Sequence, residues 1–312
     1  MVGPERYILE ECIGSGAFGA VYRARQLGTQ RPVALKILHE QLAGDPALVE
    51  RFRREAAITC SLRSPHTITV YEVDTTPDGR PYFAMELLAG KSLEETRRDG
   101  PMPWQRAFEI LVGVCRSLEE AHALGIVHRD LKPEHIFLES RHGNPDFVKV
   151  LDFGIAKRLT AESWDERTAA GQLVGTPEYM SPEQVLGRPI DGRSDLYTLG
   201  VLAFTLIAGQ TPFADVVGLA GLAMAHLDRV PVPLGSLVDV PASVDRIVAR
   251  CLAKDPDRRY ADARALCASL ERALAGGAET PRCFGFPEPH RLPHVSFGDD
   301  TLVDAVPLMT FG

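Results

Sequence analysis

The sequence lacks the features that mark membrane, secreted and nucleic-acid-binding proteins. Its longest apolar run, residues 200–209, is about half of what a transmembrane helix requires, so we interpret it as a buried core helix. The opening residues lack a basic patch followed by an apolar stretch, which argues against a secretory signal. The net charge is −8, whereas a general nucleic-acid binder usually carries a basic excess. We therefore expect a cytoplasmic protein with no membrane segment and no nucleic-acid partner.

Clustered cysteines and internal repeats are absent as well. The six cysteines are scattered, with no CxxC motif and no His/Cys cluster at zinc spacing. Such cysteines are typical of small buried side chains in a reducing compartment. The chain is 45% hydrophobic and 24% charged, which excludes wholesale disorder and is enough for a substantial core.

The first ~85 residues are predicted to be rich in β-strands, with one helix among them. Asp45 can cap a helix over residues 45–62, with Pro46 at its first position. Alternating and β-branched residues predict five strands, at residues 7–14, 20–27, 31–38, 66–73 and 81–88.

From residue 90 onward the pattern becomes helical. Residues 103–125 have apolar side chains at helical spacing and end at Gly125, and helical character continues from residue 193 to about 275. We expect a domain over residues 1–273, with a small lobe at about 7–88, a larger lobe at about 89–273 and a cleft between them. Residues 274–312, dense in Gly and Pro, read as a flexible tail.

A glycine-rich stretch, GSGAFG at residues 14–19, would allow a backbone to lie close over phosphate groups. The same pattern occurs in dinucleotide-binding loops, but those lead into a helix. Here AVYRARQL follows and reads as a strand, so a hairpin is favoured over a Rossmann fold. Lys36 on the next strand is placed under that hairpin, and Glu55 in the charged helix is its natural ion-pair partner.

Further motifs follow in an order that resembles the eukaryotic-type (Hanks-type) serine/threonine protein kinases, in particular bacterial ones. HRDLKPEH begins at His128, DFG at Asp152 and GTPEYMSPE at Gly175, with DGRSDLYTLG and CLAKDPDRR after them. The match extends over about residues 7–273. It implies an α+β protein kinase fold, with a small antiparallel-sheet lobe containing one main helix and a larger, mostly helical lobe.

The resemblance also implies an activity and a set of catalytic residues. The expected reaction transfers the γ-phosphoryl group of ATP to Ser/Thr hydroxyls of protein substrates, with Mg²⁺ as cofactor. Asp130 would accept or orient the hydroxyl proton, Lys132 would steady the γ-phosphoryl group, and Asp152 would be the main metal ligand. The implied catalytic set is Asp130, Lys132, Lys36, Glu55 and Thr176.

The resemblance further assigns an ATP-binding set. Val21, Ala34 and Phe137 match the apolar faces around adenine, Met85 matches the gatekeeper, and residues 86–88 match the hinge. The full set is Ile13, Gly14, Ser15, Gly16, Ala17, Phe18, Gly19, Val21, Ala34, Lys36, Met85, Glu86, Leu88 and Phe137.

Other matched residues are implied to be structural or regulatory. Asp195 would brace the backbone of the catalytic loop, and Glu183 would pair with Arg259. Arg129 is typical of kinases whose activation loop is ordered by a phosphate group, and activation by a homodimer is a related expectation. The predicted phosphorylation sites are Thr168, with Thr160 and Ser163 as alternatives, and Thr301 in the tail, which could bind a phosphothreonine-reading domain or could be part of an inert end.

One position departs from the family pattern. His135 stands where the pattern has an Asn that binds the second metal ion and braces the catalytic loop. His135 could bind the metal through one nitrogen, with Mn²⁺ preferred over Mg²⁺, or could only brace the loop. Alternatively, transfer is lost and the chain is an ATP-binding pseudokinase that acts as a scaffold. We favour an active kinase, because the other catalytic positions are retained.

Overall fold

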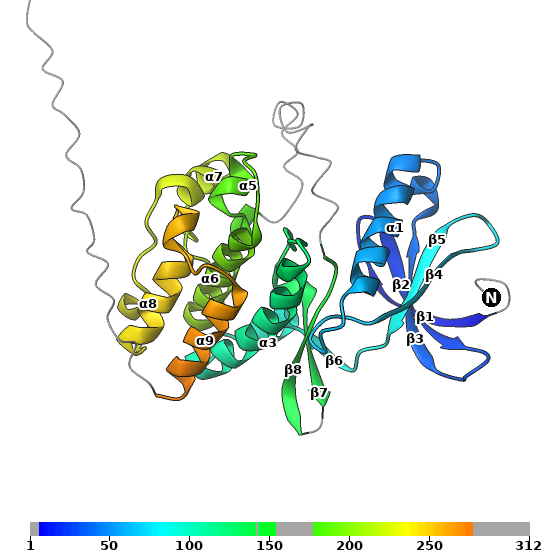
Figure 1. Cartoon of the computed structure of the whole chain (residues 1–312), viewed down its shortest axis with the longest axis horizontal. Coiled ribbons are helices and arrows are strands. Elements are labelled where there is room, and N and C mark those ends of the chain that lie inside the picture. The colour runs from blue at the N-terminus through cyan, green and yellow to red at the C-terminus, as the bar shows by residue number, and fades with distance from the viewer. Residues whose placement is uncertain (1–5, 142, 154–176, 277–312) are drawn as a thin grey trace, which may run out of the picture. The chain divides into compact units, whose positions relative to one another are not determined.

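The computed structural model describes residues 6–141, 143–153 and 177–276 (Figure 1). The N-terminal part is an antiparallel sheet with the strand order β1-β2-β3-β5-β4. One long helix, α1 (Pro46–Ser61), packs against it, with the Phe52 ring 5.1 Å from the Phe83 ring. This confirms the predicted sheet with one main helix. The strands are β1 Tyr7–Ser15, β2 Gly19–Gln26, β3 Pro32–Leu38, β4 Val70–Thr75 and β5 Pro81–Glu86.

The C-terminal part is mostly helical, as predicted. Helix α6 lies at its centre, buried along most of its length and packed against α3, α8 and α9 (Figure 1). It contains the predicted core segment and ends where Gly209 adopts φ 75°. The helices are α2 Leu93–Arg97, α3 Trp104–Ala123, α5 Pro182–Val185, α6 Gly192–Ala208, α7 Leu219–Asp228, α8 Ala242–Cys251 and α9 Ala263–Leu274. Single 3₁₀ turns lie at η1 Glu40–Leu42, η2 Pro133–His135, η5 Pro177–Tyr179, η6 Leu234–Ser236 and η7 Pro256–Arg258.

Two details of the sequence prediction were wrong. A second antiparallel sheet, with the order β6-β7-β8, lies in the region from residue 90 onward, for which the sequence predicted a mostly helical lobe and no strand was identified. Its strands, β6 Gly90–Ser92, β7 Ile136–Arg141 and β8 Asn144–Val150, are too short to give a clear period. Strand β4 begins at Val70 rather than at residue 66, because the Ile68 N–H donates to the Val150 carbonyl of β8 instead of to a neighbouring strand.

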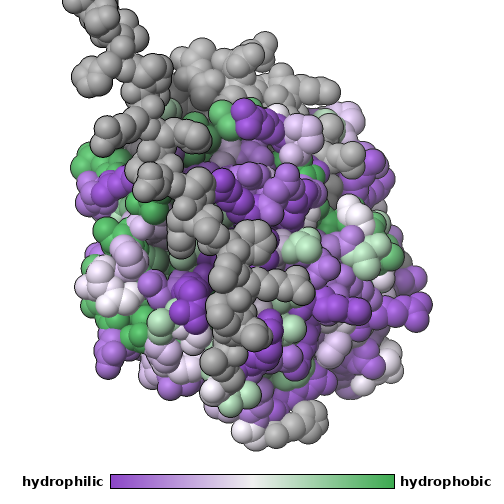
Figure 2. All heavy atoms as spheres, turned by 60° about the vertical axis from the view of Figure 1, so that its left-hand side comes forward, coloured by the Kyte–Doolittle hydropathy of each residue, from purple (hydrophilic) through white to green (hydrophobic). Residues whose placement is uncertain are grey.

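The surface drawn in Figure 2 is mainly hydrophilic, with separate apolar patches. None of the helices in the described ranges is long and apolar enough to cross a bilayer. Helix α9 ends at Leu274, and the predicted tail falls almost wholly outside the described residues. The domain limit at residue 273 stays a prediction.

Candidate active site

Three charged side chains meet where the N-terminal sheet contacts the segment after β8. Lys36 Nζ on β3 donates to Glu55 Oε1 on α1 and to Asp152 Oδ1, each at 2.8 Å. Burial lowers the pKa of Lys36, but the charges of Asp152 and Glu55 outweigh it, and the pKa is raised above its ordinary value. Burial acts to raise the pKa of Asp152, yet Lys36 brings it down to about 2. Lys36 and Asp152 are therefore both charged at neutral pH.

The loop that carries Asp130 is fixed by a buried carboxylate. Asp195 Oδ2 accepts from the His128 N–H at 2.8 Å, and its Oδ1 accepts from the Arg129 N–H at 3.0 Å. Burial acts to raise the pKa of Asp195, but hydrogen bonds from His122 and the loop backbone lower it. The carboxylate therefore stays ionised and holds the loop by two charge-assisted bonds. These two bonds are the contacts with the loop backbone that the resemblance implied for Asp195.

Backbone strain is concentrated at the same place. Arg129 has φ 66° and Asp152 has φ 47°, and they are two of the three non-glycine residues with positive φ in the described ranges. Such conformations cost about 1–3 kcal/mol each and persist where the surroundings enforce them. Arg129 directly precedes Asp130, and Asp152 is the residue that accepts from Lys36. Strain at these two positions indicates a preorganised site.

His135, at the end of η2, contacts the loop through one ring nitrogen. Its Nδ1 lies 2.7 Å from the carbonyl oxygen of Asp130. A carbonyl only accepts, so Nδ1 carries a proton and the neutral ring has its lone pair on Nε2. Burial lowers the pKa of His135, although the charges of Asp152 and Asp130 oppose this, so the ring is neutral near pH 7.

The donors near this point fit a divalent cation that is shared with a phosphate-bearing ligand. Asp152 offers carboxylate oxygen and His135 offers an imidazole nitrogen. Within the described residues, no group of three or more His, Cys, Asp or Glu side chains is arranged to hold a metal ion. A cation bound here would therefore complete its coordination with phosphate oxygens or water.

The predicted glycine hairpin between β1 and β2 is present, and side chains outside the motif hold it. The Gly16 carbonyl lies 2.9 Å from His39 Nε2, and the Arg51 guanidinium lies 4.5 Å over the Phe18 ring. Neither contact could be predicted from the sequence, because each joins segments that are separate in sequence. A Cβ at Gly19 would come within 2.3 Å of a backbone oxygen of β3, so strand packing alone demands glycine there.

The predicted adenine residues lie on neighbouring strands beside Lys36. Val21 is paired with Lys36 between β2 and β3, and Ala34 with Met85 between β3 and β5. Phe137 lies on β7 of the second sheet. The remaining members of the predicted ATP-binding set lie on β1 and the hairpin (Ile13, Gly14, Ser15 and Ala17) or just after β5 (Leu88).

Glu86, which the resemblance assigns to the hinge, is held by a side chain that the sequence did not single out. Lys149 Nζ donates to Glu86 Oε1 at 2.6 Å, and the Thr69 N–H donates to the same oxygen at 2.7 Å. The Lys149 side chain is 3% exposed and that of Glu86 is 18% exposed, so this is a partly buried ion pair between β8 and the end of β5. It links the hinge to the strand that leads to Asp152.

The predicted Glu183–Arg259 pair is formed and is bidentate. The guanidinium of Arg259 donates to Glu183 Oε1 at 2.7 Å and to Oε2 at 2.9 Å. Its other donors reach the backbone carbonyls of Ala253, Arg193 and Lys254. Burial acts to raise the pKa of Glu183, but Arg259 lowers it below its usual range. The pair fixes α5, the short helix whose second residue is Glu183.

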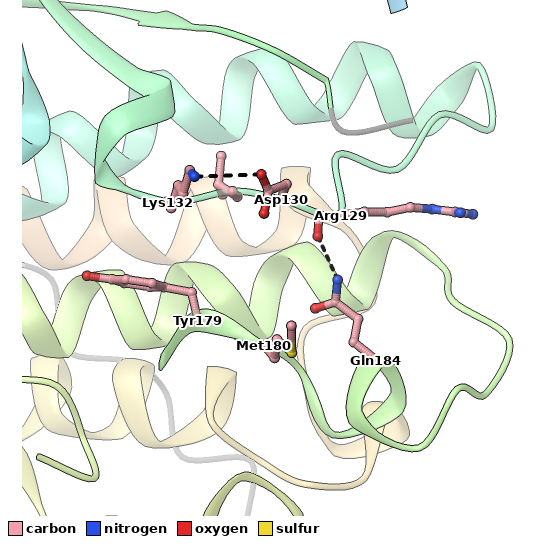
Figure 3. Close-up of a pocket in the computed structure, with 7 residues that line it drawn as sticks. Arg129, Asp130, Lys132, Tyr179, Met180 and Gln184 are labelled. Atoms are coloured by element: carbon pink, nitrogen blue, oxygen red, sulfur yellow. Dashed lines mark hydrogen bonds and ion pairs between the residues drawn. The ribbon is translucent and has the colours of Figure 1, made fainter. Parts of the chain in front are cut away.

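A pocket lies beside the catalytic loop and is bounded on its other side by η5 and α5 (Figure 3). Lys132 Nζ lies 3.9 Å from Asp130 Oδ2. The lining residues are Arg129, Asp130, Leu131, Lys132, Tyr179, Met180 and Gln184. Leu131, Tyr179, Met180 and Gln184 were not among the site residues predicted from the sequence. The predicted sites Thr176, Thr168, Thr160, Ser163 and Thr301 lie outside the described residues.

Comparisons with known proteins agree with this arrangement. Residues 7–270 match the model of the protein kinase domain. The chain is 46% identical over 264 residues to the serine/threonine-protein kinase Pkn1 of Myxococcus xanthus, covering 84% of this chain and 37% of that protein. It is 39% identical over 279 residues to the serine/threonine-protein kinase PknB of Mycolicibacterium smegmatis, covering 88% and 44%.

Solved structures of kinase domains are also similar to this chain. The crystal structure of the Mycobacterium tuberculosis PknI kinase domain superposes with a TM-score of 0.66 at 26% identity, over 87% of this chain and 96% of that one. The chain spans less than half the length of the curated relatives named above. Because the domain match covers most of the chain, the chain belongs to the protein kinase family.

Proposed function

We propose that the chain is a serine/threonine protein kinase that transfers the γ-phosphoryl group of ATP to protein substrates. The observation that carries the proposal is the bonding of Lys36 to both Glu55 and Asp152, at 2.8 Å each. Lys36 would bind the inner phosphates, Asp152 would hold the divalent cation, and Asp130 would orient the attacking hydroxyl group. Family membership implies ATP and a divalent cation as cofactors.

The test is a transfer assay with γ-labelled ATP and a general protein substrate, with Mg²⁺ and Mn²⁺ in parallel. We expect label on Ser or Thr in the wild type and background label only in Asp130→Asn. The comparisons give no support to the pseudokinase alternative. A nucleotide-dependent thermal shift without transfer under either metal would nevertheless establish it and overturn the proposal.

The finer proposal concerns His135, which we infer performs both tasks expected of the family's Asn. Its Nδ1–H holds the Asp130 carbonyl at 2.7 Å, and its Nε2 lone pair is available to a cation held together with Asp152. Imidazole nitrogen suits Mn²⁺ better than Mg²⁺, which strongly prefers oxygen ligands. Mn²⁺ is therefore the expected preference.

His135→Asn tests this assignment with a readout besides activity. We expect the variant to raise the Mg²⁺-supported rate and to weaken Mn²⁺ binding in the presence of ADP, measured by electron paramagnetic resonance. His66→Asn is the matched control, because His66 Nδ1 also contacts a backbone carbonyl, that of Val148 at 3.0 Å rather than that of Asp130. Equal Mn²⁺ affinity in wild type and His135→Asn would show that the imidazole does not reach the cation.

Several expectations from the sequence stay predictions. Autophosphorylation at Thr168, with Thr160 and Ser163 as alternatives, would be tested by phosphosite mapping after incubation with ATP. An activating homodimer, a phosphothreonine-reading partner at Thr301 and a cytoplasmic location are proposals of the same kind. Intact-mass measurement of the chain after autophosphorylation would test the tail site.

A further inference from the structure

Gln184 is the third residue of α5, and its side chain bridges two segments. Its Oε1 accepts from the Ser181 N–H at 2.9 Å, which closes the capping box of α5 together with the bond from the Gln184 N–H to Ser181 Oγ. Its Nε2 donates to the carbonyl oxygen of Arg129 at 2.6 Å (Figure 3). A helix cap needs only the acceptor, so the donated bond to the catalytic loop calls for a separate explanation.

The accepting carbonyl belongs to the peptide group that joins Arg129 to Asp130. A peptide group is planar, so fixing its carbonyl oxygen also fixes the direction of the Asp130 N–H and thereby the backbone of Asp130. Arg129 itself has φ 66°, and its N–H is held by Asp195 Oδ1 at 3.0 Å. Asp195 and Gln184 therefore hold this strained residue on its two sides.

We infer that Gln184 is a positioning residue that sets the orientation of Asp130 through the Arg129 carbonyl. The inference rests on the proposed kinase function, in which Asp130 orients the substrate hydroxyl group. Glu183, the adjacent residue, anchors α5 to Arg259 by two bonds of 2.7 and 2.9 Å. Gln184 thus connects helix α5, which Arg259 anchors to the helical part, to the catalytic loop.

The sequence offers an isosteric test. Gln184→Glu keeps the acceptor of the capping box, where Glu is equally suitable, but places a carboxylate oxygen against the Arg129 carbonyl. Ser181→Ala is the matched control, because it removes the cap and leaves the Nε2 bond in place. Both full-length variants are compared with the wild type by kcat and KM for ATP, by thermal melting, and by hydrogen exchange of residues 128–132.

We expect Gln184→Glu to melt near the wild-type temperature, to keep the KM for ATP, and to lower kcat about ten- to a hundredfold, since small misplacements at a reacting centre have such effects. Exchange of the loop amides should become faster. Ser181→Ala should instead lower the melting temperature and keep kcat. If Gln184→Glu unfolds, Gln184→Met takes its place; it removes both the Nε2 donor and the capping acceptor without adding charge, and Ser181→Ala measures the part of its effect that comes from the lost cap.

Wild-type kcat and wild-type exchange in Gln184→Glu would overturn the inference, and so would a Ser181→Ala variant with the same kinetic loss. The exchange measurement does not depend on catalysis. A chain without transfer activity would therefore contradict the proposed function, while faster loop exchange in Gln184→Glu would still support the contact as the device that orders the loop.

Discussion

Acid should destabilise the helical part of the protein through one buried imidazole, that of His226 on α7. His226 is 0% exposed, and its Nδ1 lies 2.9 Å from the hydroxyl of Tyr197, which also accepts a bond from Lys254 at 3.2 Å. The neutral ring can accept the Tyr197 hydroxyl proton at Nδ1, a bond that protonation of Nδ1 would break. Burial, and then the charge of Lys254, lowers the pKa of His226 to about 4.

The size of the effect follows from linkage. The unfolded chain binds a proton at this ring below about pH 6.5, whereas the native state does so only below about 4. Between these values the unfolded state binds more protons, so the free energy of unfolding falls as the pH falls, and it is constant above about 7. From pH 7.5 to 5 the loss amounts to about 2 kcal/mol, or roughly 4–8 °C in melting temperature.

Urea denaturation of wild type and His226→Asn at pH 7.5 and pH 5 measures this loss. Asn can place an acceptor near the position of Nδ1 and cannot titrate, so the variant should lose about 2 kcal/mol less than the wild type over the same pH change. Comparing differences removes the contributions of other histidines and of the altered packing. Identical pH dependence in the two proteins would refute the assignment of a neutral native imidazole.

Three further predictions concern the other buried charges. Arg259→Met should lower the free energy of unfolding by about 3–5 kcal/mol, because Glu183 is left as a buried unpaired charge. Adding Glu183→Gln should restore part of the lost stability, measured by urea denaturation, and no restoration would contradict the pairing. Lys36→Met should lower kcat by about 10²–10³-fold in initial-rate assays, whereas a loss below tenfold would exclude Lys36 from the reaction. Lys149→Met should raise the KM for ATP about tenfold, equivalent to ~1.4 kcal/mol, because Glu86 at the predicted hinge loses its ion-pair partner. An unchanged KM would argue that this ion pair does not shape the nucleotide site.

The sequence was sufficient wherever a local signal existed. Asp45 and Pro46 predicted the start of α1, and Asp45 does accept from the Ala47 and Leu48 N–H groups. Ordered motifs placed Lys36, Glu55 and Asp152 in one site. The short sheet β6-β7-β8 and the late start of β4 could not be foreseen, because contacts between distant segments decide them. For the same reason Lys149 and His39 escaped notice, since an isolated Lys or His in a sequence is usually a surface residue.

His135 shows why a substitution should be judged by the bonds it makes. From the sequence alone, His in place of Asn at position 135 suggests the loss of a metal ligand, and this is the basis of the pseudokinase interpretation. In the fold, the ring donates from Nδ1 to the Asp130 carbonyl at 2.7 Å, as an amide NH₂ could, and its other nitrogen remains a lone-pair donor, as an amide oxygen would be. The side chain thus retains one hydrogen-bond donor and one lone pair with which, on our proposal, it would bind the cation; that ligand atom would be softer than an amide oxygen. We therefore expect the substitution to alter which cation serves the reaction more than whether the reaction occurs.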